Sequence, residues 1–397
     1  MMIWYLSCCC IGFWTTGRID KTGRLYCAGT VNAERERRAE RIYMRHRIAV
    51  AFFGLLVAVN LAGAGDDPVV GEKPLSELLK QLRSENRGLQ MRAAQALGNA
   101  PTNLHGRIMP QLIPILKSER ENDKFVAAQT LGVYGSISRV AIPDLLPMLK
   151  GTQYERNRAA AAKALGQILK DAKSDKEVDE VTAALIEAFK DAYEDVRREA
   201  ATSCGMIGPA AKACIPHLPP LLKEPPGAEP NMVSMAAAYT CERMGPLAKE
   251  HVDLLITIMH RYASFKTPAY VLALGAIGPV QDNIVPNIMD KMEQTDQTIW
   301  WHMAPYEVFE RFGPKAAPAV DLLDRFLRES KLSPPQVVQT MKTLKAIGPA
   351  AKNAQKTVEG LTKITQYNQR YGRAATAEEV AEIKKQAAEA LKAIAGQ

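Results

Sequence analysis

Apolar residues along this chain recur in short, alanine-rich blocks that share one layout. Each block closes on an apolar residue, which we call the anchor. Apolar or small side chains precede it by eight, four and three positions, as Val196, Ala200 and Ala201 precede Cys204. Residues spaced in this way lie on one face of an α-helix. The pattern therefore predicts a helix with one buried face at every block.

The anchors follow one another at nearly regular intervals. The intervals are 34, 34, 39, 37, 33, 35, 35 and 47 residues, between Leu97, Leu131, Leu165, Cys204, Cys241, Leu274, Phe309, Leu344 and Leu391. A repeat of this size is the sequence signature of a solenoid, in which each unit buries its apolar face against its neighbours. The hexapeptide IGPAAK, at residues 207–212 and again at 347–352, marks equivalent points four units apart.

A second helix is predicted to follow each anchor helix. Gly208 supplies a stop, because glycine tolerates the left-handed conformation that ends helices. Proline then opens another apolar stretch, where its missing N–H group is not needed. Such stretches are AIPDLLPMLK, CIPHLPPLLK, IVPNIMDKM and APAVDLLDRF, at residues 141–150, 214–223, 284–292 and 317–326. No alternation typical of strands interrupts the series, so we expect an all-α fold.

Residues 194–222, EDVRREAATSCGMIGPAAKACIPHLPPLL, resemble a HEAT-like repeat of the short type found in the phycobilisome-lyase group. Tetratricopeptide repeats match less well, because they carry Leu-Gly inside a helix, whereas Gly-Pro ends the helix here. The resemblance implies a right-handed α-solenoid of about eight or nine stacked hairpins. It also implies that Asp195 and Arg197, which match the turn acid and helix base of such repeats, form pairs within or between units.

The first 74 residues do not share this period. From Met44, a basic start is followed by an apolar stretch and by Ala62-Gly63-Ala64, the layout of a secretory signal peptide. A retained membrane anchor is the alternative, but residues 48–64 fall short of the roughly 20 apolar residues that a span needs. We therefore expect export to the periplasm or the extracellular space, with no stable membrane span after cleavage.

These observations define the expected organisation of the chain. We expect residues 1–43 to be a non-native extension produced by a start-site artefact, 44–64 to be the signal peptide and 65–74 to be a linker. Residues 75–397 then form the solenoid, which ends in a capping helix. At that helix, Thr376 and Glu379 are spaced as a capping box.

Charge and cysteine content change once the leader is set aside. The whole chain has a net charge of +8, but residues 65–397 keep 42 basic and 39 acidic groups, a net of +3. This balance gives no support to nucleic-acid binding. The remaining cysteines, Cys204, Cys214 and Cys241, occupy anchor or other core positions, and we interpret them as small core residues rather than metal ligands or nucleophiles.

No catalytic constellation is found in the sequence. Nucleophile-elbow, phosphate-loop, dinucleotide-binding and zinc motifs are absent, and the histidines after the leader are scattered. We therefore assign no catalytic residue, metal ligand or cofactor. The function expected is a non-catalytic scaffold that binds a protein or peptide. A lyase-like or chaperone-like accessory factor for a chromophore or cofactor is the alternative.

Candidate contact residues come from the helix positions opposite the core. Positions nine, six and two residues before an anchor point away from the core and form an exposed stripe, which in HEAT-like stacks lines the concave side. In the later units this stripe is apolar, and we predict that it binds the partner through Met232, Met235, Tyr239, Phe265, Leu272, Trp300 and Met303. The alternative is that these residues pack against neighbouring units. In the third and fourth units the stripe is charged, and its secondary candidates are Arg156, Lys163 and Arg198.

Overall fold

The computed structural model describes residues 67–150, 153–223, 232–261, 268–294, 303–368 and 373–397, and the backbone of two short strands nearer the N-terminus. The chain divides into two compact units, Met1–Asp67 and Pro68–Gln397. In the first unit, β1 (Arg18–Ile19) pairs antiparallel with β2 (Leu25–Tyr26). The rest of the predicted extension and the predicted signal peptide lie outside the described residues.

The second unit opens on a small hairpin inside the predicted linker. Its strands are β3 (Val69–Val70) and β4 (Lys73–Pro74), which pair antiparallel. From Leu75 onward the described chain consists of helices and their connections, apart from one isolated bridge between Asn368 and Ala374.

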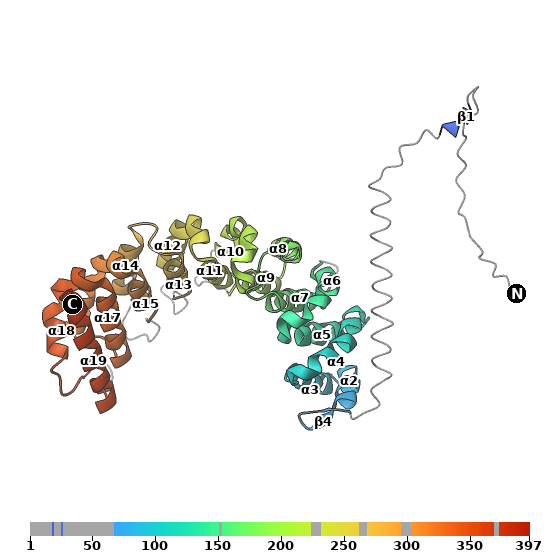
Figure 1. The fold of residues 1–397 in the computed structure, drawn as a ribbon, viewed down its shortest axis with the longest axis horizontal. Helices are drawn as coiled ribbons and strands as arrows, with labels where there is room; N and C mark the ends of the chain where they lie inside the picture. The colour runs from blue at the N-terminus through green and yellow to red at the C-terminus, as the bar shows by residue number, and fades with distance from the viewer. Residues whose placement is uncertain are drawn as a thin grey trace. The chain divides into compact units, whose positions relative to one another are not determined.

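Helical hairpins form the second unit, and they stack in two layers (Figure 1). One layer holds the helices that carry the predicted anchors, called the anchor helices: α3 (Arg87–Gly98), α5 (Glu121–Val133), α7 (Glu155–Ile168), α9 (Glu194–Ile207), α11 (Met232–Met244), α13 (Pro268–Ile277), α15 (Met303–Phe312), α17 (Pro334–Ile347) and α19 (Ala377–Ile394). The partner helices are α2 (Leu75–Leu82), α4 (Thr102–Leu112), α6 (Ile142–Leu145), α8 (Lys176–Ala188), α10 (Pro219–Leu222), α12 (Val252–Arg261), α14 (Ile284–Gln294), α16 (Val320–Arg328) and α18 (Gln355–Leu361). Each anchor helix contacts the next one along the chain, so the all-α solenoid predicted from the period is confirmed.

Glycine ends several anchor helices, as the sequence predicts. The φ angles of Gly208 and Gly348, the glycines of the two IGPAAK copies, are 76° and 70°. Side chains strongly disfavour this region, so glycine is required there. From the sequence we expected the partner helix to follow the glycine directly, but the structure differs. A 3-10 helix comes first in η2 (Gly135–Ala141), η4 (Gly208–His217), η5 (Gly245–His251), η6 (Gly313–Ala319) and η7 (Gly348–Ala354). Short 3-10 turns of this kind are common connectors at helix ends.

Two further 3-10 helices finish partner helices in the early units. They are η1 (Ile113–Lys117), after α4, and η3 (Leu146–Leu149), after α6. Proline lies at the second residue of each, at Pro114 and Pro147. Because proline cannot donate the backbone hydrogen bond of an α-helix, the helices tighten at these points.

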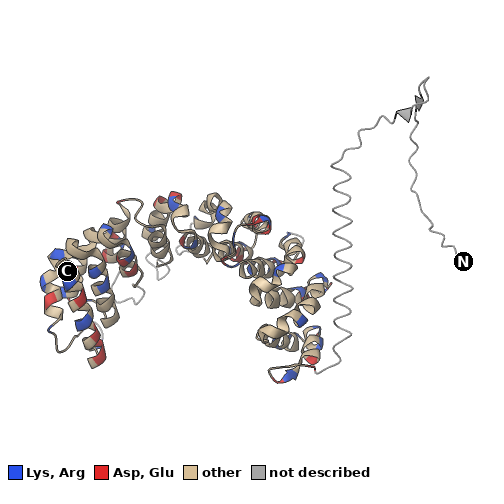
Figure 2. Cartoon of the chain, viewed as in Figure 1, with Lys and Arg blue, Asp and Glu red and all other residues tan. Residues whose placement is uncertain are grey.

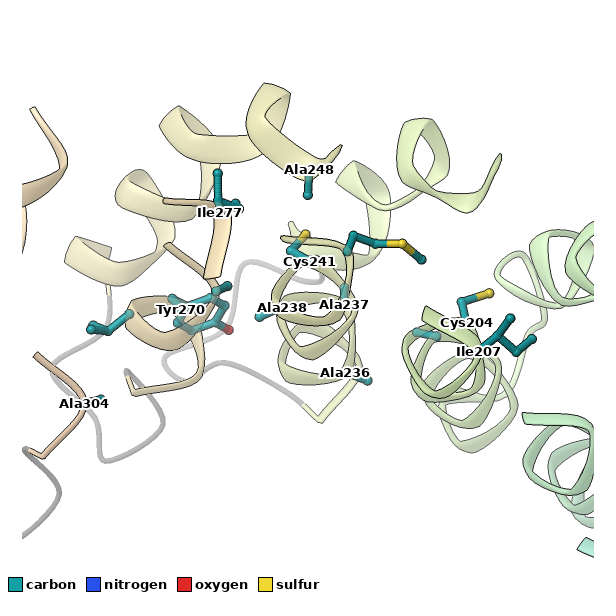
Figure 3. Close-up of a cluster of buried hydrophobic side chains, with 14 of the residues drawn as sticks. Cys204, Ile207, Ala236, Ala237, Ala238, Cys241, Ala248, Tyr270, Ile277 and Ala304 are labelled. Carbon is teal, nitrogen blue, oxygen red and sulfur yellow. The ribbon is translucent and has the colours of Figure 1, made fainter. Parts of the chain in front are cut away.

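The core lies between the two layers and follows the predicted register except at the last anchor, where Leu391 is half-buried and Ala390, one residue earlier, is completely buried. Val196, Ala200, Ala201 and Cys204 are all completely buried. Cys241 occupies the same anchor position in α11, and Figure 3 shows it among small apolar side chains. All three cysteines of the second unit are buried free thiols, and burial raises the pKa of the Cys204 thiol. A thiol that stays protonated is a weak nucleophile, which agrees with a packing role.

Neighbouring anchor helices approach each other closely because their contact surfaces are small. A Cβ atom built on Gly166, in α7, would lie only 2.6 Å from the Cα atom of Ser203, in α9. At two anchors, the preceding residue carries a hydroxyl group that forms a hydrogen bond to the neighbouring anchor helix. Ser203 Oγ donates to the Ala162 carbonyl at 2.9 Å, and Thr240 Oγ1 donates to the Ala201 carbonyl at 2.7 Å. Small side chains and hydrogen bonds from hydroxyl groups therefore hold neighbouring anchor helices close to one another.

Adding one methyl group at this contact is expected to destabilise the fold. Gly166→Ala should lower the free energy of unfolding by about 1–3 kcal/mol, because the new Cβ would overlap the Ser203 side chain and also the Ser203 Cα atom, which no side-chain rotation can move away. Urea titration followed by circular dichroism measures the change.

The matched control for that substitution is Gly360→Ala in α18. A Cβ atom there would meet no other atom within 4 Å. Alanine forms helices better than glycine, so we expect a gain of up to about 1 kcal/mol. If both substitutions moved stability in the same direction, the close approach of α7 and α9 would not be the cause of the first effect.

A buried ion pair joins the third and fourth units. Arg158, in α7, donates from Nε to Asp191 Oδ2 at 2.7 Å, and each side chain is less than one-tenth exposed. Burial raises the pKa of Asp191, but the hydrogen bonds from Arg158 and from the Tyr193 backbone outweigh that effect and leave the pKa below its usual value. The carboxyl is therefore an anion in the folded chain.

The acid of this pair is Asp191, and not the Asp195 that matches the turn acid of HEAT-like repeats. Asp195 forms an ion pair with Arg198 instead, at 3.0 Å, and Asp195 is largely exposed. Arg197 donates to the backbone carbonyls of Asp191 and Ala192. Asp195 thus forms a pair within its own unit, as the resemblance implied, whereas Asp191 reaches Arg158 of the preceding unit.

The last helix begins with the predicted capping box. The Glu379 backbone N–H donates to Thr376 Oγ1 at 3.2 Å, and the Thr376 backbone N–H donates to Glu379 Oε2 at 2.8 Å. A hydrogen bond from Arg373, followed by the one from the Thr376 backbone, lowers the pKa of Glu379 to about 2. These bonds satisfy backbone donors at the start of α19, which fixes where the final helix begins.

Candidate protein-binding face

The anchor helices present one side to the core and the opposite side to solvent, and we call this second side the anchor-helix face. In the third to fifth units, every residue of the predicted stripe is exposed or half-buried. Residues eight, four and three positions before the same anchors are buried. The stripe therefore lies away from the core in these units. Charged side chains of both signs are spread along the helices of the second unit (Figure 2).

The apolar part of the stripe is only partly open to solvent. Met232, at the start of α11, is 48% exposed, whereas Met235 and Tyr239 are half-buried. The Tyr239 ring lies against Gly205 of α9, where a Cβ atom would meet it at 2.7 Å. Packing against a neighbouring unit, the alternative to partner binding in the sequence analysis, thus buries part of the Tyr239 side chain.

Two other apolar candidates show the same partial burial, and two cannot be placed. Leu272, in α13, and Met303, in α15, are half-buried, and Leu272 packs against the core. Phe265 and Trp300 lie outside the described residues. The proposal of a continuous apolar patch therefore depends most on Met232.

The three charged candidates have different surroundings. Arg198 is neutralised by Asp195 and by Glu199, at 3.0 and 2.9 Å. Arg156 is half-buried, and its guanidinium lies 3.6 Å from the centre of the Phe125 ring. Lys163 is exposed and forms no hydrogen bond or ion pair with a described residue. Lys163 is thus the candidate cation that is free to meet a ligand.

A hollow in the anchor-helix face joins three consecutive helices at the start of the solenoid. Its volume is about 400 Å³, and its lining comes from α3, α5 and α7. The lining includes Met91, Gln95, Gln129 and Lys163, which lie six or two residues before their anchors. The volume is within the usual range for ligand sites, about 300–1,000 Å³. Among the described residues this hollow is our candidate contact site.

Sequence reasoning found Lys163 but missed the residues that α3 and α5 contribute. The predicted stripe begins at the third unit and therefore does not include Met91, Gln95 and Gln129. The same positions counted back from Leu97 and Leu131 identify all three. The signal was present in the sequence, but the hollow itself depends on how three helices pack.

No group of three or more His, Cys, Asp and Glu side chains is placed to hold a metal ion within the described ranges. In the same ranges, no helix combines the length and apolar character required to cross a bilayer. The anchor-helix face presents a row of amide, cationic and apolar side chains at the hollow, which suits binding.

Comparisons with known proteins agree with this fold. The family model for HEAT repeats matches residues 75–166 and 142–229. Residues 75–229 therefore match HEAT repeats, and the stacked hairpins continue the same architecture through the rest of the second unit. A search of the curated proteins finds no match to the sequence.

Solved structures of similar shape are helical solenoids with low sequence identity. An engineered protein is 18% identical with a TM-score of 0.50, over 81% of this chain and 88% of its own. Kap121p in complex with Nup53p is 15% identical with a TM-score of 0.57, over 81% of this chain and 39% of its own. The complex of CpcE and CpcF of phycocyanin lyase from Nostoc is 19% identical with a TM-score of 0.40, over 66% of this chain and 97% of its own. At these identities the first two structures show a similar fold and nothing more. The TM-score of the third is too low for any conclusion.

Proposed function

We propose that the protein is a non-catalytic scaffold that binds a polypeptide along its anchor-helix face. The observation that carries the proposal is the hollow of about 400 Å³, which three consecutive anchor helices line with the side chains they turn away from the core. In solenoids, contacts are made by such extended faces. Kap121p, a solenoid of similar fold, has been crystallised bound to Nup53p, so a solenoid of this kind can bind another protein.

The proposed place of action is outside the cytoplasm. The basic start, apolar stretch and small-residue site within residues 44–64 support export. The proposed partner is a protein or peptide that the scaffold meets after export.

Photo-crosslinking can test which layer contacts the partner. A photoreactive residue is introduced into the full chain at Lys163 or Met232, on the anchor-helix face, and the producing cells are irradiated. We expect one and the same polypeptide to be crosslinked from both positions, because both belong to one continuous face. Mass spectrometry of the adducts identifies it.

Matched positions on the partner helices provide the control. Asp179, in α8, and Asp253, in α12, belong to the same units as Lys163 and Met232 and are also exposed. We expect no adduct with that polypeptide from these positions. If the adducts came equally from both layers, or only from the partner helices, the proposed binding face would be wrong.

A further inference from the structure

The hollow over α3, α5 and α7 carries positive charge that the folded chain does not neutralise. Arg92 and Lys163 line it, both are exposed, and neither forms an ion pair or hydrogen bond with a described residue. None of the residues that line the hollow is acidic. Arg198, one unit further on, contrasts with them, since two carboxylates neutralise it. The unpaired cations of the hollow therefore favour an anionic ligand.

Amide side chains form a second feature of the hollow. Gln95, Gln129 and Gln167 come from the three successive anchor helices, and their amides form no hydrogen bond with a described residue. The Gln167 amide reaches over Gly132, where the absence of a side chain leaves room for it. A primary amide both donates and accepts hydrogen bonds, as a peptide group does. A row of amides can thus pair with the backbone of an extended chain.

The walls of the hollow are apolar. Met91 is 37% exposed and Val133 is 58% exposed, although both are large hydrophobic residues. Gly98 opens the space beside Val133, whose methyl group lies 3.8 Å from the position of a Cβ atom on Gly98. Exposed apolar side chains beside a hollow are suited to cover an apolar side chain of a ligand.

We propose that this hollow binds an extended acidic segment of a polypeptide that also carries an apolar side chain. Arg92 and Lys163 would meet its carboxylates, the amides of Gln95 and Gln129 its backbone, and Met91 its apolar side chain. Neighbouring helices pack about 8–10 Å apart and an extended chain rises about 3.3 Å per residue, so three helices accommodate about six residues. This inference rests on the proposed function and specifies the chemistry of its partner.

Fluorescence anisotropy with defined peptides tests the inference on the full chain. The probe is a labelled octapeptide, Glu-Asp-Leu-Glu-Asp-Leu-Glu-Asp, and its comparison peptide replaces every Glu with Gln and every Asp with Asn. We expect the acidic probe to bind about tenfold more tightly or better, and its affinity to fall as salt is raised. Reversing both cations in R92E/K163E should abolish that preference.

A variant with the same change of charge elsewhere is the control. Lys212 and Lys352 are exposed lysines of the two IGPAAK copies, away from the hollow, so K212E/K352E should bind the acidic probe as the unaltered chain does. Circular dichroism and thermal melting confirm that each variant is folded. Lys163→Gln provides a milder change at an exposed position, and we expect it to weaken binding several-fold.

Three results would overturn the inference. They are equal binding of the neutral peptide, unchanged binding in R92E/K163E, and preferential binding of a single-stranded oligonucleotide over the acidic probe. The proposed function is tested separately. If the crosslinks from Lys163 and Met232 identify a polypeptide while the acidic probe shows no preference, this inference fails and the proposed function stands.

Discussion

Replacing Asp191 with alanine is expected to lower the free energy of unfolding by about 3–5 kcal/mol, because Arg158 would remain buried and charged without its partner. Arg158 also donates to the Gln153 carbonyl, but one neutral acceptor does not compensate a buried cation. The pair joins the third unit to the fourth, so the loss should weaken the solenoid there first. Urea titration gives the size of the effect, and hydrogen exchange in α7 and α9 locates it.

Two comparisons keep this prediction specific. Glu187 pairs with Lys190 at 3.1 Å, but both are more than two-thirds exposed, so Glu187→Ala should cost less than about 1 kcal/mol. The double variant Arg158→Met, Asp191→Ala should lower the free energy of unfolding by less than the sum of the two single variants. Equal losses at the exposed and buried pairs would contradict the prediction.

Lowering the pH should weaken the same ion pair between Arg158 and Asp191. The pKa of Asp191 lies below its unfolded value, so its contribution to stability is complete above about pH 4 and is lost as the pH falls further. The unaltered chain should therefore lose more stability between pH 4 and lower values than Asp191→Ala, for which this contribution is already absent.

Shortening an anchor is the second change with a large expected effect. Leu165 is completely buried in α7, and Leu165→Ala removes its side chain from the core between two layers. We expect a loss of about 2–5 kcal/mol, from the lost burial and from the cavity that remains. Denaturant titration measures the loss in the same way.

An exposed leucine is the matched control for Leu165→Ala. Leu247, in η5, is 48% exposed, and Leu247→Ala should change stability by no more than about 0.5 kcal/mol. A loss at Leu165 as small as the loss at Leu247 would mean that the anchor period does not identify the core.

The period along the sequence was sufficient to predict the fold. Its anchors predicted one layer of helices, and the smallest of them, Cys204 and Cys241, are buried there like leucines. Helix ends were also predictable at Gly208, because its positive φ angle depends on a local property of glycine. The 3-10 helices that follow were not predicted, since proline permits either form of helix at such a position.

Pairs between units could not be predicted in the same way. Asp191 and Asp195 are four residues apart before and within α9, and both are acidic. Only the packing of α7 on α9 determines that Asp191 reaches Arg158. The hollow is a similar case. Positions counted from Leu97 identify Met91 and Gln95 as outward residues, but the space between helices depends on three helices together.

Close packing within the anchor layer has a consequence for how the protein responds to force. A Cβ atom on Gly166 would overlap Ser203, so α7 and α9 leave no room to be pressed closer together at this point. Each anchor helix contacts its neighbours in sequence, and the partner helices meet one another over smaller contacts. Bending should therefore be elastic and occur mainly by changes of spacing among the partner helices. Small rotations at each hairpin would then add up along the array, so a solenoid of this kind can lengthen and shorten as a spring does.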